Sequence, residues 1–217
     1  MVFYALFALE LLVLFFLSRL LSQSLSNLFF RITRSKTITI YLLSLLFFPG
    51  VAIHELSHLL SASILFVPVG EVEFIPQIKE NEVKLGSVGV GKTDPVRRAI
   101  IGFAPVIVGT AIIITFLSYF STDTLLGKLI AGYIFFEIGN TMFSSKKDFE
   151  GTIELLVAIA LISAILTFFG FHLPQVVFEQ FSSLKLIEFI KKSDTLLLIP
   201  VGIDIVFFAV TKAIIRN

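Results

Sequence analysis

Six long apolar runs constrain this chain more than any other feature of its sequence. They cover residues 2–21, 38–67, 99–120, 125–143, 153–171 and 196–215. A helix needs about 20 apolar residues to cross a hydrocarbon layer of ~30 Å. In lipid, only helices and closed barrels satisfy every backbone hydrogen bond. We therefore expect a membrane all-α fold, a polytopic bundle of about six transmembrane helices.

The composition supports this fold class and argues against some functions. Of the 217 residues, 56% are hydrophobic and 15% are charged. An ordinary soluble domain carries about 25% charged residues. The net charge of +1 offers no electrostatic basis for binding nucleic acid. The chain has no cysteine, so any metal must be held by histidine, aspartate or glutamate.

The second apolar run contains the motif His-Glu-Leu-Ser-His at residues 54–58. Two histidines four residues apart lie on one helical face, so both imidazoles can reach a single ion. The spacing is typical of zinc hydrolases and predicts Zn²⁺ bound by His54 and His58, with Glu55 as general base. The alternative is a pair of ordinary hydrogen-bonded core histidines. Ionisable groups inside a membrane-spanning run are costly, which favours the metal site.

Pro49-Gly50 lies one helical turn before the first histidine of this motif. A proline inside a helix removes one backbone hydrogen bond and commonly kinks the helix. The pair predicts either a simple packing bend or a local break that admits water to the metal.

Residues 69–92 differ in character from the apolar runs. Residues 71–76 and 82–90 show partial two-residue alternation, and a polar stretch separates them. This pattern predicts a small β-hairpin or sheet at the membrane edge, after the second helix. The hairpin is either a plain surface feature or an edge strand that binds an extended substrate.

A catalytic zinc has three protein ligands and one open position, so a third ligand is needed. The remaining histidine, His172, is far along the chain, which leaves a carboxylate as the expected ligand. If the helices alternate in direction, Asp148 lies near the same membrane face as the motif histidines. Glu137, Glu150 and Glu154 are the alternatives.

The second and fourth runs resemble the core of the site-2 proteases, zinc metalloproteases that cut within or beside membrane segments. That family has His-Glu-x-x-His in one membrane helix. A later helix carries Asn-x-x-Pro, with an aspartate eight residues after the asparagine. Residues 54–58 match the first motif, and Asn140 and Asp148 keep the interval of the second. Phe143 stands where the family has proline. The resemblance covers roughly residues 45–151.

The resemblance implies an intramembrane zinc metalloprotease that hydrolyses peptide bonds within or next to transmembrane segments. It implies the metal ligands His54, His58 and Asp148, with Glu55 as the catalytic base. It also implies that Asn140 is a catalytic residue that hydrogen-bonds the substrate backbone or the oxyanion. The expected partners are the lipid bilayer and a transmembrane protein or peptide. We expect an integral, multi-pass protein of a prokaryotic cell membrane. The alternatives are a non-catalytic membrane scaffold that retains the motif and a metal transporter.

We expect one domain over residues 1–217. Its catalytic core covers about residues 38–151, including the edge β region at 69–92. Residues 22–36 are expected to form a polar link between the first two helices. Residues 175–194 alternate apolar and charged positions at helical spacing, which predicts an amphipathic helix on the membrane surface or packed on the bundle.

Overall fold

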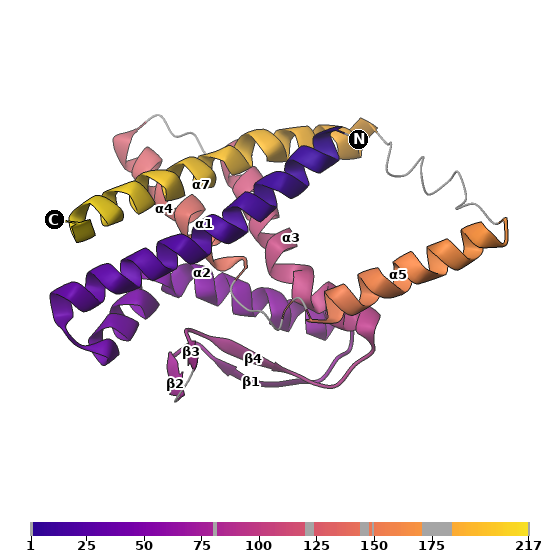
Figure 1. Cartoon of the computed structure of the whole chain (residues 1–217), viewed down its shortest axis with the longest axis horizontal. Helices are drawn as coiled ribbons and strands as arrows, with labels where there is room; N and C mark the ends of the chain where they lie inside the picture. Colours follow the sequence, from indigo (N-terminus) through magenta and orange to yellow (C-terminus); the bar gives the residue numbers. More distant parts are fainter. Residues whose placement is uncertain are drawn as a thin grey trace.

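The computed structural model describes residues 2–79, 82–119, 124–143, 148, 150–170 and 184–216. Six helices fill most of these ranges (Figure 1): α1 Val2–Thr33, α2 Lys36–Ile64, α3 Pro95–Tyr119, α4 Leu125–Thr141, α5 Glu150–Phe168 and α7 Leu184–Arg216. Within the described residues, four helical stretches are long and apolar enough to cross a membrane: Ala5–Thr33, Lys36–Ile64, Pro95–Ile113 and Leu197–Ile215. The predicted helical membrane fold is therefore confirmed in outline.

The polar link predicted at residues 22–36 is wrong, because α1 continues as a helix to Thr33. Leu21 and Leu25 are one helical turn apart, and both are buried against Phe47 of α2. This apolar face keeps the segment helical despite its serine content. The turn is only two residues long: Arg34 has a φ of 54°, and Ser35 caps α2 by accepting a hydrogen bond from the Ile38 N–H.

The C-terminal region also differs from the prediction. Residues 184–194 do not form a separate surface helix but are the beginning of α7, which continues through the last apolar run. Ile190 and Leu197 are seven residues apart and both are buried, so one apolar face runs across the predicted boundary. The other part of the predicted amphipathic helix, residues 175–183, lies outside the described residues.

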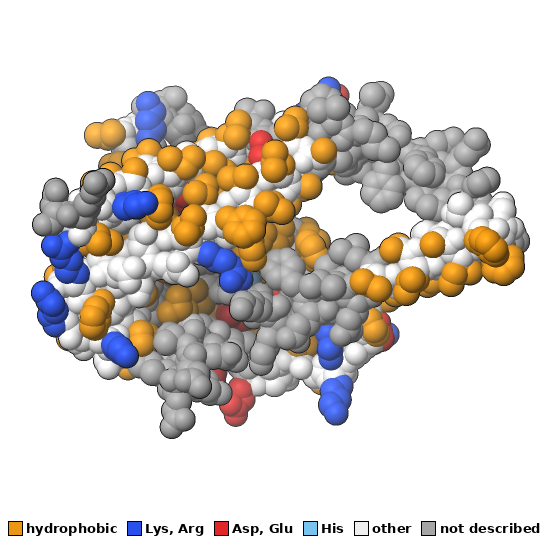
Figure 2. All heavy atoms as spheres, viewed as in Figure 1, with side chains coloured by type: hydrophobic (Ala, Val, Ile, Leu, Met, Phe, Trp, Pro, Cys, Tyr) orange, Lys and Arg blue, Asp and Glu red, His pale blue; other side chains and the backbone are white. Residues whose placement is uncertain are grey.

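The first and last helices lie side by side and run in the same direction (Figure 1). At their C-terminal ends, the Arg31 guanidinium donates hydrogen bonds to the carbonyl oxygens of Ile214 and Ile215. Hydrophobic side chains cover the surface of this helix pair, and basic side chains gather at the end where α1 turns into α2 (Figure 2). Such a distribution suits a helix pair surrounded by lipid.

The hairpin predicted at residues 69–92 is confirmed. Strand β1 (Val69–Glu73) pairs antiparallel with β4 (Ser87–Val90), in the register Val72 to Val88. Further out, β2 (Gln77–Lys79) pairs antiparallel with β3 (Glu82–Lys84). The β1–β4 ladder runs beside α2 (Figure 1).

The C-terminal half of helix α4 lies at the centre of the bundle. Every side chain from Phe135 to Phe143 is buried. Phe135, Ile138 and Met142 form one apolar cluster with Leu14 of α1 and Leu197 of α7. Because α4 contacts α1, α2, α3 and α7, its buried polar residues Glu137, Asn140 and Thr141 lie at helix interfaces.

Candidate metal centre

The two motif histidines lie one turn apart on α2, and both are buried. The Nε2 atoms of His54 and His58 are 3.1 Å apart. Their rings meet edge to face, with centroids 4.7 Å apart. The predicted placement on one helical face is therefore confirmed, and both ring nitrogens point to one place.

Asp148 completes a group of three possible metal ligands. Its Oδ2 lies 3.2 Å from Nε2 of His54, and its Oδ1 lies 3.4 Å from Nε2 of His58. Within the described part of the chain, this is the group of histidine and acidic side chains that could hold a metal ion. The aspartate comes from the segment between α4 and α5, 94 residues after His54.

The spacing of these atoms fits a tetrahedral ion. Zinc bonds to histidine nitrogen and carboxylate oxygen measure about 2.0–2.2 Å, so tetrahedral angles separate neighbouring ligand atoms by about 3.3–3.6 Å. The distances from Nε2 of His54 to Nε2 of His58 and to Oδ2 of Asp148, 3.1 and 3.2 Å, lie just below this range, and the other carboxylate oxygen, Oδ1, lies 3.4 Å from Nε2 of His58. Two imidazole nitrogens and one carboxylate are therefore close enough to share a metal ion, and a fourth position is left for a water or substrate.

A backbone contact sets the tautomer of His58. Its Nδ1–H donates a hydrogen bond to the carbonyl oxygen of Ile101 in α3, across 2.8 Å. The lone pair of Nε2 is then free to face the other two ligands, as is usual for metal-binding histidines. For Nδ1 of His54, no partner is found among the described atoms.

Gly102 of α3 makes room for Asp148. A Cβ atom on this glycine would overlap the carbonyl oxygen of Asp148. The neighbouring Ile101 provides the acceptor for His58, so one turn of α3 positions two of the three possible ligands. Burial raises the pKa of the Asp148 carboxyl. When no metal is bound and the two imidazoles carry a proton on Nε2, hydrogen bonds from His54 and His58 outweigh burial and lower this pKa to about 2.

Glu55 lies between the two histidines and is also buried. Its carboxylate faces the β1–β4 ladder, where the backbone N–H of Val88 donates to it. A Cβ atom on Gly86 would lie 3.1 Å from Cγ of Glu55 and 2.6 Å from a methyl group of Val51. The ladder therefore packs closely over the predicted general base and limits its movement.

Asn140 is buried on α4, with its amide directed to α7. Nδ2 donates to the carbonyl oxygen of Phe136 at 2.9 Å and to Oδ1 of Asp204 at 2.7 Å. Both amide hydrogens are thus in use. In this arrangement Asn140 can contact another molecule only through its Oδ1, as an acceptor.

The other acidic residues considered as third ligands lie elsewhere. Glu137 is buried on α4, and its Oε2 accepts a hydrogen bond from the Gly50 N–H at 3.1 Å. Glu150 and Glu154 belong to α5, and their side chains lie outside the described atoms. His172 also lies outside the described residues. Among the described side chains, Asp148 is the carboxylate that meets the histidines.

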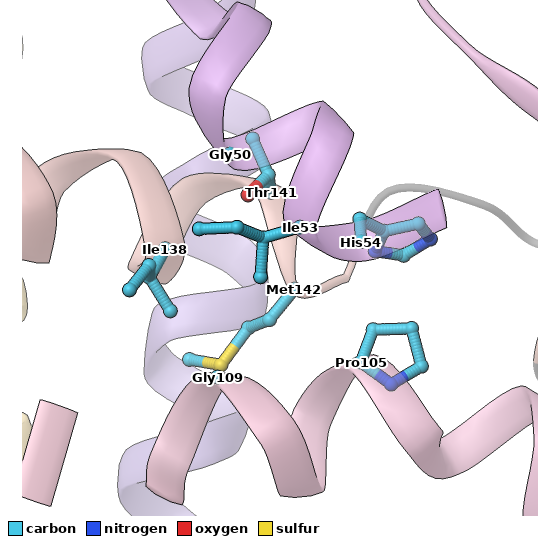
Figure 3. A pocket seen from close by; sticks show the side chains of 8 residues that line it. All are labelled: Gly50, Ile53, His54, Pro105, Gly109, Ile138, Thr141 and Met142. Carbon is cyan, nitrogen blue, oxygen red and sulfur yellow. The ribbon is translucent and has the colours of Figure 1, made fainter. Parts of the chain in front are cut away.

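A small pocket lies beside the ring of His54 (Figure 3). Figure 3 shows Pro105 next to this ring, with Ile53 and Met142 further inside. Thr141 adds a hydroxyl group, which donates to the backbone of its own helix. One side of the His54 imidazole is therefore covered by apolar side chains. They exclude water there and strengthen electrostatic interactions at the site.

Several residues that position the site were not singled out by the sequence. Gly86 and Ile101 have no distinguishing pattern. Gly102 lies in a stretch of small residues of the third apolar run, and Asp204 is an acid within the last apolar run. No protein-family model matches the chain, and no curated protein or solved structure matches it. The likeness to site-2 proteases therefore depends on the motif residues themselves.

Proposed function

We propose that this chain is an intramembrane zinc metalloprotease of the site-2 type. The observation that carries the proposal is the convergence of His54, His58 and Asp148, with Glu55 adjacent to the two histidines. The four candidate spans and the buried position of both histidines support cleavage at or below the membrane surface. Under this proposal the chain crosses the membrane several times.

Each residue has a defined task in the proposed hydrolysis. His54, His58 and Asp148 would hold Zn²⁺. When bound, the ion polarises the peptide carbonyl and acidifies a water molecule. Glu55 would take the proton as the water oxygen attacks the carbonyl carbon. It would then pass that proton to the amide nitrogen as the C–N bond breaks, so that a carboxylate and an amine are released.

Asn140 would bind the substrate backbone in this scheme. Both of its amide hydrogens are used by Phe136 and Asp204, so its remaining capacity is as an acceptor. We therefore propose that Asn140 accepts a hydrogen bond from a peptide N–H of the substrate, and that it does not donate to the oxyanion.

The test uses the full chain purified in detergent, with zinc content and cleavage of fluorescein-labelled casein measured on the same samples. We expect about one zinc per chain in the wild type, as the three ligands predict. His58→Ala and Asp148→Ala should lose the metal, and Asp94→Ala, on the surface, should keep it. Glu55→Gln should keep zinc and lose cleavage, while Glu71→Gln should keep both.

The outcomes separate the competing functions. Zinc without any cleavage by the wild type, together with zinc uptake into vesicles, would favour a transporter. Absence of zinc after metal supplementation would favour a scaffold that retains the motif. Cleavage that survives in Glu55→Gln would contradict the assigned base.

A further inference from the structure

The strongest feature outside the possible metal ligands is a buried acid–amide contact between α4 and α7. Asp204 is fully buried and Asn140 is nearly so. The two helices approach closely here, because a Cβ atom on Gly139 would lie 2.9 Å from Cβ of Pro200. Acidic groups inside membrane-spanning helices are rare and usually functional.

The orientation of the Asn140 amide follows from its neighbours. The carbonyl oxygen of Phe136 can only accept a hydrogen bond, so the atom 2.9 Å from it must be the amide nitrogen. The same nitrogen donates to Oδ1 of Asp204 at 2.7 Å. The amide oxygen is therefore the amide atom that faces away from the Phe136 carbonyl, and no described group donates to it as long as Asp204 is ionised.

Two acceptor atoms of this pair lack donors in the described part of the structure: Oδ1 of Asn140 and Oδ2 of Asp204. The described ion pairs join Asp148 to the two histidines and Asp94 to Arg97, and none includes Asp204. An ionised carboxylate buried without a cation and with one bare oxygen would be very costly. A single proton on Asp204 neutralises the charge and also provides the missing hydrogen-bond donor.

We propose that Asp204 is a neutral carboxylic acid whose Oδ2–H donates to Oδ1 of Asn140, closing a two-hydrogen-bond ring that holds the amide. Asp204 is then a positioning residue for Asn140. The oxygen of the Asn140 amide keeps one free lone pair, and Asp204 of α7 fixes the direction in which this lone pair points. The significance of that lone pair for a substrate rests on the proposed function, whereas the protonation of Asp204 does not.

Infrared difference spectroscopy tests the protonation directly. The full chain is prepared in an ester-free detergent at neutral pH, with and without carboxyl-¹³C aspartate. We expect a carboxylic-acid carbonyl band that shifts with the label and disappears in Asp204→Asn. Asp94→Asn should keep the band, because Asp94 is exposed and pairs with Arg97. Loss of an ionised-carboxylate band in Asp204→Asn, in place of the acid band, would overturn the proposal.

Cleavage of labelled casein tests the positioning role. Asp204→Asn provides an acceptor and a donor to the same amide, so cleavage should stay close to the wild-type rate. Asp204→Leu provides neither, so both hydrogen bonds of the ring are lost, and cleavage should fall by at least roughly tenfold with zinc content unchanged. Equal impairment in both variants, or none in Asp204→Leu, would contradict the role.

The two measurements also separate this inference from the proposed function. If the wild type does not cleave casein, the infrared result still decides whether Asp204 is protonated. If Asp204→Leu does not fold, the comparison of the wild type with Asp204→Asn still decides it.

Discussion

The backbone N–H of Gly50 donates a hydrogen bond to the carboxylate of Glu137, across 3.1 Å between α2 and α4. This contact follows directly after Pro49, which has no N–H to donate within the helix. The carbonyl oxygen of Leu46 accepts a hydrogen bond from the Tyr133 hydroxyl, also on α4. Two side chains of α4 therefore hold α2 at its proline, one turn before His54.

Gly50→Ala should destabilise the protein and weaken zinc binding. The added Cβ would lie 2.5 Å from Oγ1 of Thr141 and 2.8 Å from the carbonyl oxygen of Glu137. Overpacking of this kind costs about 1–3 kcal/mol, which thermal unfolding in detergent would detect as a lower Tm. Gly132→Ala is the matched control, since a Cβ there meets nothing within 4 Å. An unchanged Tm in Gly50→Ala would show that α2 and α4 are not in such close contact.

Gly102→Ala should lower the affinity for zinc more than it lowers Tm. Its Cβ would overlap the carbonyl oxygen of Asp148, so the aspartate must move away from the two histidines. Competition with a chromophoric chelator measures the affinity, and the Gly132→Ala protein again provides the reference. If Gly102→Ala binds zinc as tightly as the wild type, the close contact between Gly102 and the backbone of Asp148 does not position this aspartate.

Gly86→Ala should reduce casein cleavage while zinc remains bound. The new Cβ would press on Cγ of Glu55 and on Val51, and so displace the proposed general base rather than a proposed metal ligand. Gly70→Ala, in the partner strand, is the control, because its nearest neighbour would be at an ordinary 3.6 Å. Parallel loss of zinc and cleavage in Gly86→Ala would instead indicate a disturbance of α2 as a whole.

The pH dependence of zinc binding should come from the histidines and not from Asp148. The folded pKa of Asp148 is about 2, below its usual value of 3.8. A lowered pKa means that the carboxylate stabilises the fold above about pH 4, and that this contribution is lost only as the pH falls toward about 2. Between pH 5 and 8 it stays ionised and ready to bind metal.

Imidazole must be neutral to bind zinc, and a histidine side chain in a model peptide has a pKa of about 6.5. We expect affinity to fall on acidification by up to about two decades per pH unit, because two protons compete with each ion. Chelator competition from pH 5 to 8 measures this slope. In His58→Ala with a raised zinc concentration, the slope should halve. A slope that persists above pH 8, or that exceeds two decades per pH unit at lower pH, would point to other groups.

Local patterns in the sequence account for the part of the site that lies within one helix. The spacing of four residues between His54 and His58 placed both imidazoles on one face without knowledge of the fold. Two-residue alternation likewise predicted the hairpin at residues 69–92. Helix boundaries do not follow from such patterns alone, because the continuation of α1 to Thr33 depends on burial of Leu21 and Leu25 against another helix.

By itself, the sequence determined that the chain is mainly helical, with runs long and apolar enough to cross a membrane and a His-Glu-x-x-His face, because run length and helical periodicity are local properties. Only the tertiary structure decided that Asp148, rather than Glu137, meets the histidines. It also decided that Asn140 pairs with Asp204, which is 64 residues away along the chain. The physical reason is that these contacts depend on how closely backbones approach at glycines such as Gly102, and local spacing carries no information about that approach.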